Sequence, residues 1–318
     1  MEGFRRRSSI KEVLGKLRAD YILYIFLAII ILWYVIFQYL PMGGLLLAFK
    51  EYDPAEGIIN SDFIGIAQFQ NLMFGNFSRE FWRAFRNTYQ ISIYGLIFGF
   101  PFPIMLAIFF SEIGNNFYRK IVQTCSYLPH FISEVTITGL VIFLVYHSKM
   151  ATGIIAKILF ELNIIPEGTK ILATPKYFKP LYIITGLWKE SGYSSIVYFA
   201  AVMGVSPVLY EALKVDGGNK WQELRYVTLP SIMPMITVML IMKIGRMLNI
   251  GYERIILLYN PTVYETADII SSFVYRKGVA EGNTALGTAA GMFNAVLGFI
   301  LVIGANTMSR KVTETSLW

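Results

Sequence analysis

Residues 21–40 read YILYIFLAIIILWYVIFQYL, a run of twenty residues without a charged side chain. A helix of about 20 apolar residues is long enough to cross the hydrocarbon core of a bilayer. The run exceeds the ~7–15 apolar residues of a signal peptide, and no small-x-small cleavage motif follows it. We therefore interpret it as a retained membrane helix. The preceding arm, residues 1–20, is basic and contains Arg5, Arg6, Arg7, Lys11, Lys16 and Arg18.

The composition extends this interpretation to the whole chain of 318 residues, of which 55% are hydrophobic and only 15% charged. Soluble domains carry about 25% charged residues, so the deficit indicates an integral membrane protein. The single cysteine, Cys125, excludes an internal disulfide and a cysteine metal cluster, and the presence of only two histidines argues against a histidine metal site. The net charge of +7 comes from lysines and arginines that flank apolar runs, which is typical of membrane topology and not of nucleic-acid binding.

Five further apolar runs follow, and together with the first they predict an all-α membrane domain of six helices over residues 21–309, followed by a tail at 310–318. The candidate spans lie near residues 88–111, 132–147, 180–204, 235–258 and 285–309. The third run is short for a span, and its helix can begin earlier, at the YLPHF turn. The fourth and fifth runs contain internal charges that lower their hydropathy.

The basic arm decides the predicted orientation, because basic residues next to a strong span stay in the cytoplasm. With six spans, the C-terminal tail with Arg310 and Lys311 is then cytoplasmic too, although the basic residues of the chain as a whole are nearly balanced between the two sides. Residues 41–87 and 148–179 are expected outside. Within the second of these, TGIIAKILFELN has one apolar helical face and predicts a short helix on the outer membrane surface.

A polar stretch interrupts the apolar pattern between the fourth and fifth spans: residues 211–230 read EALKVDGGNKWQELRYVTLP. Fair helix formers lead to Gly217, where a glycine readily takes the positive φ that ends a helix. Asn219 is a good N-cap and Gln222 lies three residues later, which predicts a second short helix. Two prolines are then expected to break the chain before the next span: Pro230 and Pro234.

This stretch resembles the EAA loop of permease subunits in bacterial ABC importers, whose pattern is E-A-A, three residues, G, nine residues, I-x-L-P. The residues that match at the right spacing are Glu211, Ala212, Gly217, Leu229 and Pro230. Leucine replaces the second alanine at 213 and valine replaces isoleucine at 227. In the family the loop, here residues 205–234 with Asp216 before the glycine, forms a coupling helix that docks in a groove of the ATPase subunit.

Three other segments extend the resemblance to nearly the whole chain: YLPHFIS at 127–133, WKESGYSSIVYFAA at 188–201 and GYERIILLYNPTVYETADII at 251–270. They are similar to maltose-type permeases, in the LplB-like branch that imports oligosaccharides and polysaccharide fragments. The resemblance implies the type I ABC importer permease fold in a bacterial cytoplasmic membrane.

The resemblance also implies the assembly in which such a permease works. It pairs with a second, similar permease, two ATP-binding subunits and an extracytoplasmic solute-binding protein. ATP and Mg are held by the ATPase subunits, and no cofactor is expected on this chain, which lacks GxxxxGK[ST] and is expected not to be an enzyme.

Charges inside the predicted spans are the first candidates for the substrate path. Lys189 and Glu190 lie in the fourth span, and Lys243 and Arg246 lie in the fifth on a face shared with Asn249. A charge at that depth costs about 2.5–3.5 kcal/mol and must face the bundle or a wet cavity. Either Glu190 pairs with Lys243 or Arg246 and joins the helices, or the group lines the sugar path, where its positive surplus suits an acidic oligosaccharide.

Aromatic and amide side chains supply the other candidates, since sugars stack on aromatic faces. Trp188, Tyr193 and Tyr252 are aromatic candidates, although such residues also form interfacial belts and pack helices. Asn294 is a polar candidate because an amide inside a span requires a partner.

Two other functions remain open at this level. An ion-coupled secondary transporter would use the buried charges and usually shows internal repeats, which we do not find. A membrane-embedded enzyme such as a glycan acyltransferase would need a catalytic histidine or carboxylate pair. Neither function explains the EAA-like loop.

Overall fold

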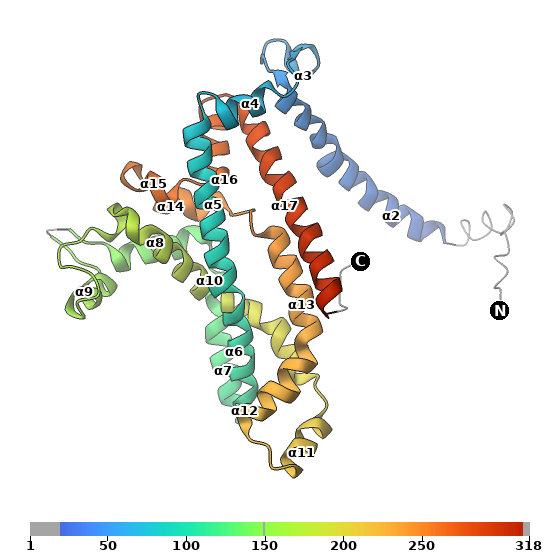
Figure 1. Ribbon diagram of the computed structural model, residues 1–318, viewed down its shortest axis with the longest axis vertical. Helices are drawn as coiled ribbons and strands as arrows, with labels where there is room; N and C mark the ends of the chain where they lie inside the picture. The colour runs from blue at the N-terminus through green and yellow to red at the C-terminus, as the bar shows by residue number, and fades with distance from the viewer. Residues whose placement is uncertain (1–19, 149, 314–318) are drawn as a thin grey trace, which may run out of the picture.

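A computed structural model describes residues 20–148 and 150–313, so most of the predicted basic arm and residues 314–318 of the predicted tail lie outside the described residues. The described chain consists of helices joined by loops, with one small two-stranded hairpin, which confirms the predicted all-α membrane fold (Figure 1). Among the described residues, four helices are long and apolar enough to cross a membrane. Two bent helix pairs raise the number to six if each pair counts as one span.

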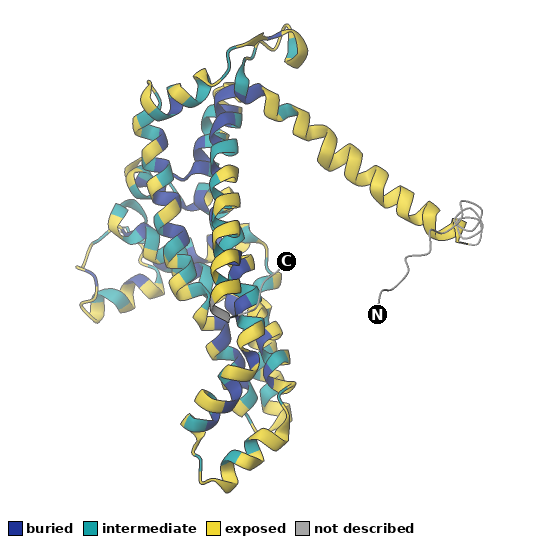
Figure 2. Ribbon diagram, turned by 45° about the vertical axis from the view of Figure 1, so that its right-hand side comes forward, coloured by how far each residue is buried: buried dark blue, intermediate teal, exposed yellow. Residues whose placement is uncertain are grey.

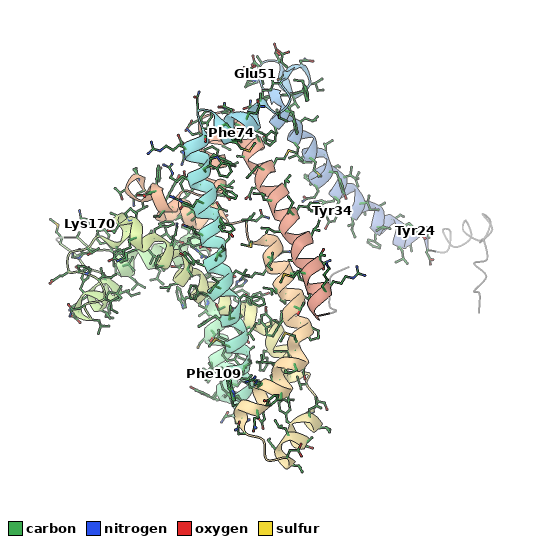
Figure 3. All side chains as sticks on the ribbon, in the orientation of Figure 1. Tyr24, Tyr34, Glu51, Phe74, Phe109 and Lys170 are labelled. Atoms are coloured by element: carbon green, nitrogen blue, oxygen red, sulfur yellow. The ribbon has the colours of Figure 1, made fainter. Side chains whose placement is uncertain are left out.

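The first predicted span is one continuous rod, Tyr21–Phe49. It consists of α2 (Tyr21–Tyr34), a π-helical turn η1 (Val35–Tyr39) and a 3-10 segment η2 (Leu40–Phe49). No residue of α2 is buried, and the rod leaves the rest of the molecule at an angle (Figures 1 and 2). The side chains of Tyr24 and Tyr34 extend into open space (Figure 3). The apolar surface of α2 is therefore left exposed by the described part of the chain.

A small cap follows the rod. Strand β1 (Lys50–Glu51) pairs antiparallel with β2 (Asp62–Phe63), with α3 (Gly57–Asn60) between them and α4 (Ala67–Phe74) after them. The cap lies at the top of Figure 1, where Glu51 and Phe74 are marked in Figure 3.

The second span is longer than predicted. Helices α5 (Ser78–Gly99) and α6 (Pro101–Glu112) form one helix of 35 residues, so it begins ten residues before the predicted start at 88. The polar first turns of α5 hid this extension. Their apolar residues Phe81 and Ala84 lie in a hydrophobic core cluster, but the polar residues between them, such as Arg79, Glu80 and Arg83, interrupt the apolar run.

The third predicted span, 132–147, is wrong as a single span. Helix α8 (Glu134–Val145) has only 12 residues and reaches a membrane-spanning length only together with α7 (Asn116–Tyr127) and η3 (Leu128–Phe131). The two parts meet at 101°. Pro129 in η3 and the N-cap Ser133, whose hydroxyl accepts from the Thr136 N–H at 3.2 Å, produce this bend.

The sixth predicted span is confirmed by α17 (Thr284–Thr313), and the fourth is a helix, α10 (Pro175–Met203), which counts as a candidate span together with the helix after it. Before α10, the predicted short helix is present as α9 (Ile154–Glu161), with η4 at Ile171–Ala173. After α10, the chain bends by 65° into α11. The next elements are α11 (Pro207–Val215), α12 (Lys220–Gln222), η5 (Glu223–Thr228) and α13 (Leu229–Arg246).

Two expectations for the fifth span are wrong. The chain does not break at Pro230 and Pro234, because Lys220–Arg246 is one continuous helix. It breaks instead after Arg246, twelve residues before the predicted end at 258. The chain then continues through short elements: α14 (Tyr252–Leu258), η6 (Pro261–Val263), α15 (Tyr264–Ala267), α16 (Ile270–Phe273) and η7 (Val274–Ala280).

The two long helices Tyr21–Phe49 and Lys220–Arg246 accommodate a proline in the same way. Helix η1 ends two residues before Pro41, and η5 ends two residues before Pro230. A proline removes a backbone donor and clashes with the carbonyl four residues earlier. A π-helical turn shifts the hydrogen bonds by one residue and lets the helix continue.

Aromatic packing fixes α5 against α16 and α17. Phe81 is fully buried, with its ring centroid 6.1 Å from Phe273 and 5.3 Å from Phe293. A second cluster, around Tyr198 and Ala107, joins α10 to α6. Gly192 lets α10 approach α7, since an added Cβ there would lie 1.9 Å from the Ser126 carbonyl oxygen. These contacts leave a space between α5, α10 and α13.

Candidate functional site

A cavity of about 760 Å³ occupies this space. Its walls are α5, α6, α10 and α13, and residues 247–254 close one side. The size falls in the range of small-molecule sites, ~300–1,000 Å³. Because residues 247–254 follow the end of α13, the point at which α13 ends determines where this side of the cavity lies.

The break after α13 is held by side chains from three other helices. Residues 247–251 leave backbone carbonyls without helical partners, and such groups are costly away from water unless they are paired. Ser92 of α5 donates to the carbonyl of Met247, Asn294 of α17 to Leu248 at 3.2 Å, and Ser271 of α16 to Ile250 at 2.7 Å. Asn294 therefore has the buried partner that its type requires, and this partner is the backbone of the break.

The end of α13 delivers two cations to the cavity. Lys243 and Arg246 lie in its last turn, where the negative end of the helix dipole favours positive charge. Both side chains are exposed to the cavity that they line. The Lys243 ammonium donates to the carbonyl of Gly99, the last residue of α5, at 3.1 Å.

A third cation, Arg254 of α14, reaches the cavity from the other side. Its guanidinium donates to Glu134, and the same carboxylate accepts from the Lys189 ammonium at 3.0 Å. Gly186 makes room for the arginine, since an added Cβ would lie 2.8 Å from Arg254 Nη1. Lys189 is only 8% exposed and points to Glu134, so it does not line the cavity.

Glu190 lines the cavity. One interpretation of the sequence paired it with Lys243 or Arg246, but the structure shows no such ion pair among the described residues. The Oε2 of Glu190 lies 3.0 Å from His130 Nδ1 of η3. The His130 ring stacks on Tyr193, with centroids 3.9 Å apart and an interplanar angle of 3°. The helix-joining role assigned to Glu190 therefore falls to Glu134, which connects α8, α10 and α14.

The structure brings together only part of the predicted path. Glu190, Tyr193, Lys243, Arg246 and Asn249 line the cavity. Asn249 lies beyond the helix end, so the helical face that it was expected to share with Lys243 does not exist. The remaining candidates lie elsewhere: Trp188 is 45% exposed outside the cavity lining, Tyr252 stacks on Tyr275 at 5.6 Å, and Lys189 and Asn294 have the partners given above.

Sequence reasoning missed Arg254 and Tyr182, both of which line the cavity. The Arg254 guanidinium also lies over the Tyr182 ring, 5.2 Å from its centroid. The fifth predicted span runs to residue 258, and Arg254 would lie near the end of such a helix. The break at 247–251 instead places Arg254 on the separate helix α14, where it lines the cavity.

The charges that line the cavity are unequal. Three are cationic, from Lys243, Arg246 and Arg254, and one is anionic, from Glu190. Arg254 shares the Glu134 carboxylate with Lys189, whereas Lys243 and Arg246 form no ion pair with a described residue, so the cavity presents a positive surface. It is suited to a ligand with carboxylate or phosphate groups.

The 205–234 loop is at the opposite end of the molecule from the cap (Figure 1). Helix α11 ends in a Schellman motif: the Gly218 N–H donates to the Leu213 carbonyl at 2.8 Å and the Gly217 N–H to the Lys214 carbonyl at 3.0 Å. Gly217 has φ +78°, and an added Cβ at Gly218 would lie 2.5 Å from Leu213 Cγ. The turn therefore requires both glycines.

The predicted second helix of the loop is confirmed and begins with a full capping box. The Asn219 N–H donates to Gln222 Oε1 at 2.7 Å, and the Gln222 N–H to Asn219 Oδ1 at 3.0 Å. Lys220 then bridges Glu223 at 2.8 Å and Glu112 at 2.9 Å, which ties the loop to the end of α6.

The outer surface of the loop is exposed and partly apolar. Glu211, Ala212, Asp216 and Gly217 are all exposed. Large apolar side chains are exposed beside them: Val208 at 66%, Leu209 at 48%, Val215 at 88% and Trp221 at 66%. A rigid turn that carries exposed apolar groups fits a surface that docks on another protein.

Comparisons with known proteins agree with this geometry. Residues 99–314 match a family described as binding-protein-dependent transport system inner membrane component. From Bacillus subtilis (strain 168), the polygalacturonan/rhamnogalacturonan transport system permease protein YteP is 35% identical over 98% of this chain and 95% of its own. Protein LplB of the same strain is 34% identical over 96% and 93%.

A solved structure is similar over nearly its whole length. It is a bacterial ABC transporter involved in the import of the acidic polysaccharide alginate, 43% identical, with a TM-score of 0.85 over 95% of this chain and 99% of the matched one. The alginate transporter has also been solved in complex with an alginate pentasaccharide-bound periplasmic protein.

Proposed function

The chain belongs to the family of binding-protein-dependent transport system inner membrane components, and we propose that it translocates acidic oligosaccharides. It is a permease subunit of an ABC importer, is not an enzyme, and works with a periplasmic binding protein. This membership overturns the ion-coupled alternative, because the family is coupled to ATP-binding-cassette subunits.

The positive cavity is the observation that carries the proposal for the substrate. Lys243, Arg246 and Arg254 line a space in which Glu190 is the one carboxylate among the described lining residues. Arg254 has Glu134 as a partner, but a neutral sugar would leave Lys243 and Arg246 without a carboxylate, whereas a uronate would pair with them. The acidic polysaccharides named for the relatives, polygalacturonan and alginate, support the same class of substrate.

We propose that the 205–234 loop couples this transport to ATP hydrolysis. Its Schellman turn and capping box make α11 and α12 a rigid unit, and Lys220 joins that unit to α6. A displacement of the loop can then reach the cavity walls through α6 and through the continuous helix Lys220–Arg246. Within the loop, Glu211, Ala212, Asp216, Gly217, Leu229 and Pro230 are the coupling residues of the proposal.

The proposed assembly contains a second, similar permease and two ATPase subunits that hold ATP and Mg. The exposed apolar side chains of the loop support such a partner on that side of the molecule. We place the loop and both termini in the cytoplasm. The basic arm before α2 supports this orientation.

The substrate proposal is tested by uptake into proteoliposomes that contain the complete importer and its binding protein. An acidic trisaccharide of uronates and its methyl ester differ in charge but hardly in shape. We expect ATP-dependent uptake of the acid with a KM at least about tenfold below that of the ester, since each lost charge-assisted contact costs ~1.5–3 kcal/mol. Equal uptake of both sugars would contradict the proposal.

A further inference from the structure

Lys179 lies one helical turn beyond the cavity, at its distal end, which we define as the end that faces away from the 205–234 loop. It shares a stripe of α10 with the cavity-lining residues Ile183 and Gly186, three to four positions apart. The opposite wall continues in the same way, from Ile91 of the cavity lining to Asn87 one turn earlier on α5. Lys179 therefore continues the same stripe of α10 from the cavity toward the cap.

The ammonium of Lys179 is held in place by neutral groups. It donates to Asn87 Oδ1 at 3.0 Å and to Gln90 Oε1. Asn87 is itself fixed, because its Nδ2 donates to the carbonyls of Glu265 at 2.9 Å and Asp268 at 3.0 Å. Both hydrogens of the amide are used, so its oxygen must face the lysine.

The charge of Lys179 is not neutralised by this arrangement. Its hydrogen bonds in the described part of the chain go to amide oxygens, and its electrostatic neighbours are the cation Arg86 and the anion Glu265. By contrast, the neighbouring cations Arg83 and Arg276 both bind the buried Asp268 carboxylate, at 3.2 and 2.9 Å. An ammonium has three N–H donors, and two are used here, so one is free for a ligand.

The contacts to α5 give the spacing between this cation and the cavity. Lys179 meets α5 at Gln90, and Lys243 meets it at Gly99. Nine residues of helix separate these two positions, a rise of about 13.5 Å. A single uronate ring is too short to contact both cations, whereas a chain of several rings can.

We propose that Lys179 is a specificity-determining residue that binds one carboxylate of an acidic oligosaccharide at the distal end of the cavity, while Lys243 binds another farther in. The inference rests on the proposed function and adds a minimum length to the substrate. It assigns to Asn87 and Gln90 the positioning of the ammonium.

The test uses the complete importer in proteoliposomes with three probes: a uronate monosaccharide, an acidic trisaccharide and the trisaccharide methyl ester. Lys179→Gln should raise the KM for the acidic trisaccharide about tenfold, the effect of losing one charge-assisted hydrogen bond. The KM for the ester and for the monosaccharide should change less than about twofold, and Lys179→Arg should restore the wild-type value. Lys176→Gln is the matched control, because it removes an exposed charge from the same end of α10.

Two outcomes would overturn the inference: no change in any KM, or an equal rise for the acid and the ester, which is the mark of a merely structural lysine. These outcomes differ from failure of the proposed function, in which the wild-type importer itself does not distinguish acid from ester. If the glutamine variant does not assemble, the wild-type importer decides the question. Carbodiimide coupling of the acidic trisaccharide should then form an amide on Lys179 and not on Lys176, and labelling of both or neither would contradict the inference.

Discussion

At the scale of residues, buried charges in this molecule depend on partners that are distant in sequence. Lys189 and Glu190 are neighbours in the chain, yet a helix turns about 100° per residue. Lys189 therefore reaches Glu134 at 3.0 Å, while Glu190 reaches His130 at 3.0 Å and faces the cavity. The sequence showed that both charges lie inside a span, but it did not show which wall each of them faces.

The first prediction concerns Glu134, whose carboxylate forms ion pairs with both Lys189 and Arg254. Glu134→Gln leaves two poorly exposed cations without an anion, and breaking a buried ion pair in this way typically costs ~3–5 kcal/mol. We expect a clear fall in the thermal unfolding temperature of the purified complex. Glu190→Gln is the control, because its side chain is 48% exposed and should cost far less. Equal stability of the two variants would show that Glu134 does not hold the three helices together.

At the scale of elements, the sequence predicted the helices well and their interruptions poorly. Apolar runs of sufficient length marked α2, α10 and α17 correctly, and local capping residues marked the turn at Gly217. Pro230 was expected to end a helix, but the π turn η5 before it accommodates the missing donor. The observed break, at 247–251, is stabilised by hydrogen bonds from side chains of α5, α16 and α17. These residues are distant in sequence, so the local pattern around residue 247 did not predict the break.

The second prediction tests the support of that break. Asn294→Ala removes the donor to the Leu248 carbonyl and leaves a buried acceptor without its partner, at a cost of ~1–3 kcal/mol. We expect a lower unfolding temperature and a weaker affinity for substrate, because Lys243 and Arg246 lie at the end of the same helix. Val296→Ala, at a 48% exposed position two residues along α17, should change neither quantity. If both variants behave like wild type, the amide does not support the break.

The third prediction tests the loop. Gly217 has φ +78°, which proline cannot adopt, so Gly217→Pro should disrupt the turn between α11 and α12. Glu211→Lys instead reverses a charge on the exposed surface of α11 without altering its backbone. We expect both variants to reach the membrane and to lose ATP-driven uptake by at least about tenfold. Normal uptake by both would remove the coupling role from this loop.

At the scale of the whole molecule, this chain has more exposed apolar surface than its own contacts can cover. The rod Tyr21–Phe49 is the clearest case, since none of its apolar window is buried. The exposed apolar residues of the 205–234 loop are another, at the opposite end of the long axis from the cap (Figure 1). A lipid bilayer can cover the first surface, and in the proposed assembly an ATPase subunit covers the second.

The fourth prediction follows from this surface. Native mass spectrometry of the importer, extracted gently through a tag on this chain, should give one copy of this chain, one second permease and two ATPase subunits with a Walker motif. Removal of the exposed apolar side chain by Trp221→Ser should weaken retention of the ATPase but not of the second permease. A chain that is isolated alone and still transports would contradict the proposed assembly.

The most direct test of the account is a cryo-electron microscopy structure of the complete importer, with ATP hydrolysis blocked, in the presence of an acidic trisaccharide. The account predicts sugar density between α5, α10 and α13, with carboxylates beside Lys243, Arg246 or Arg254. Density for the sugar outside this cavity, or an empty cavity under conditions in which binding is measured, would contradict it.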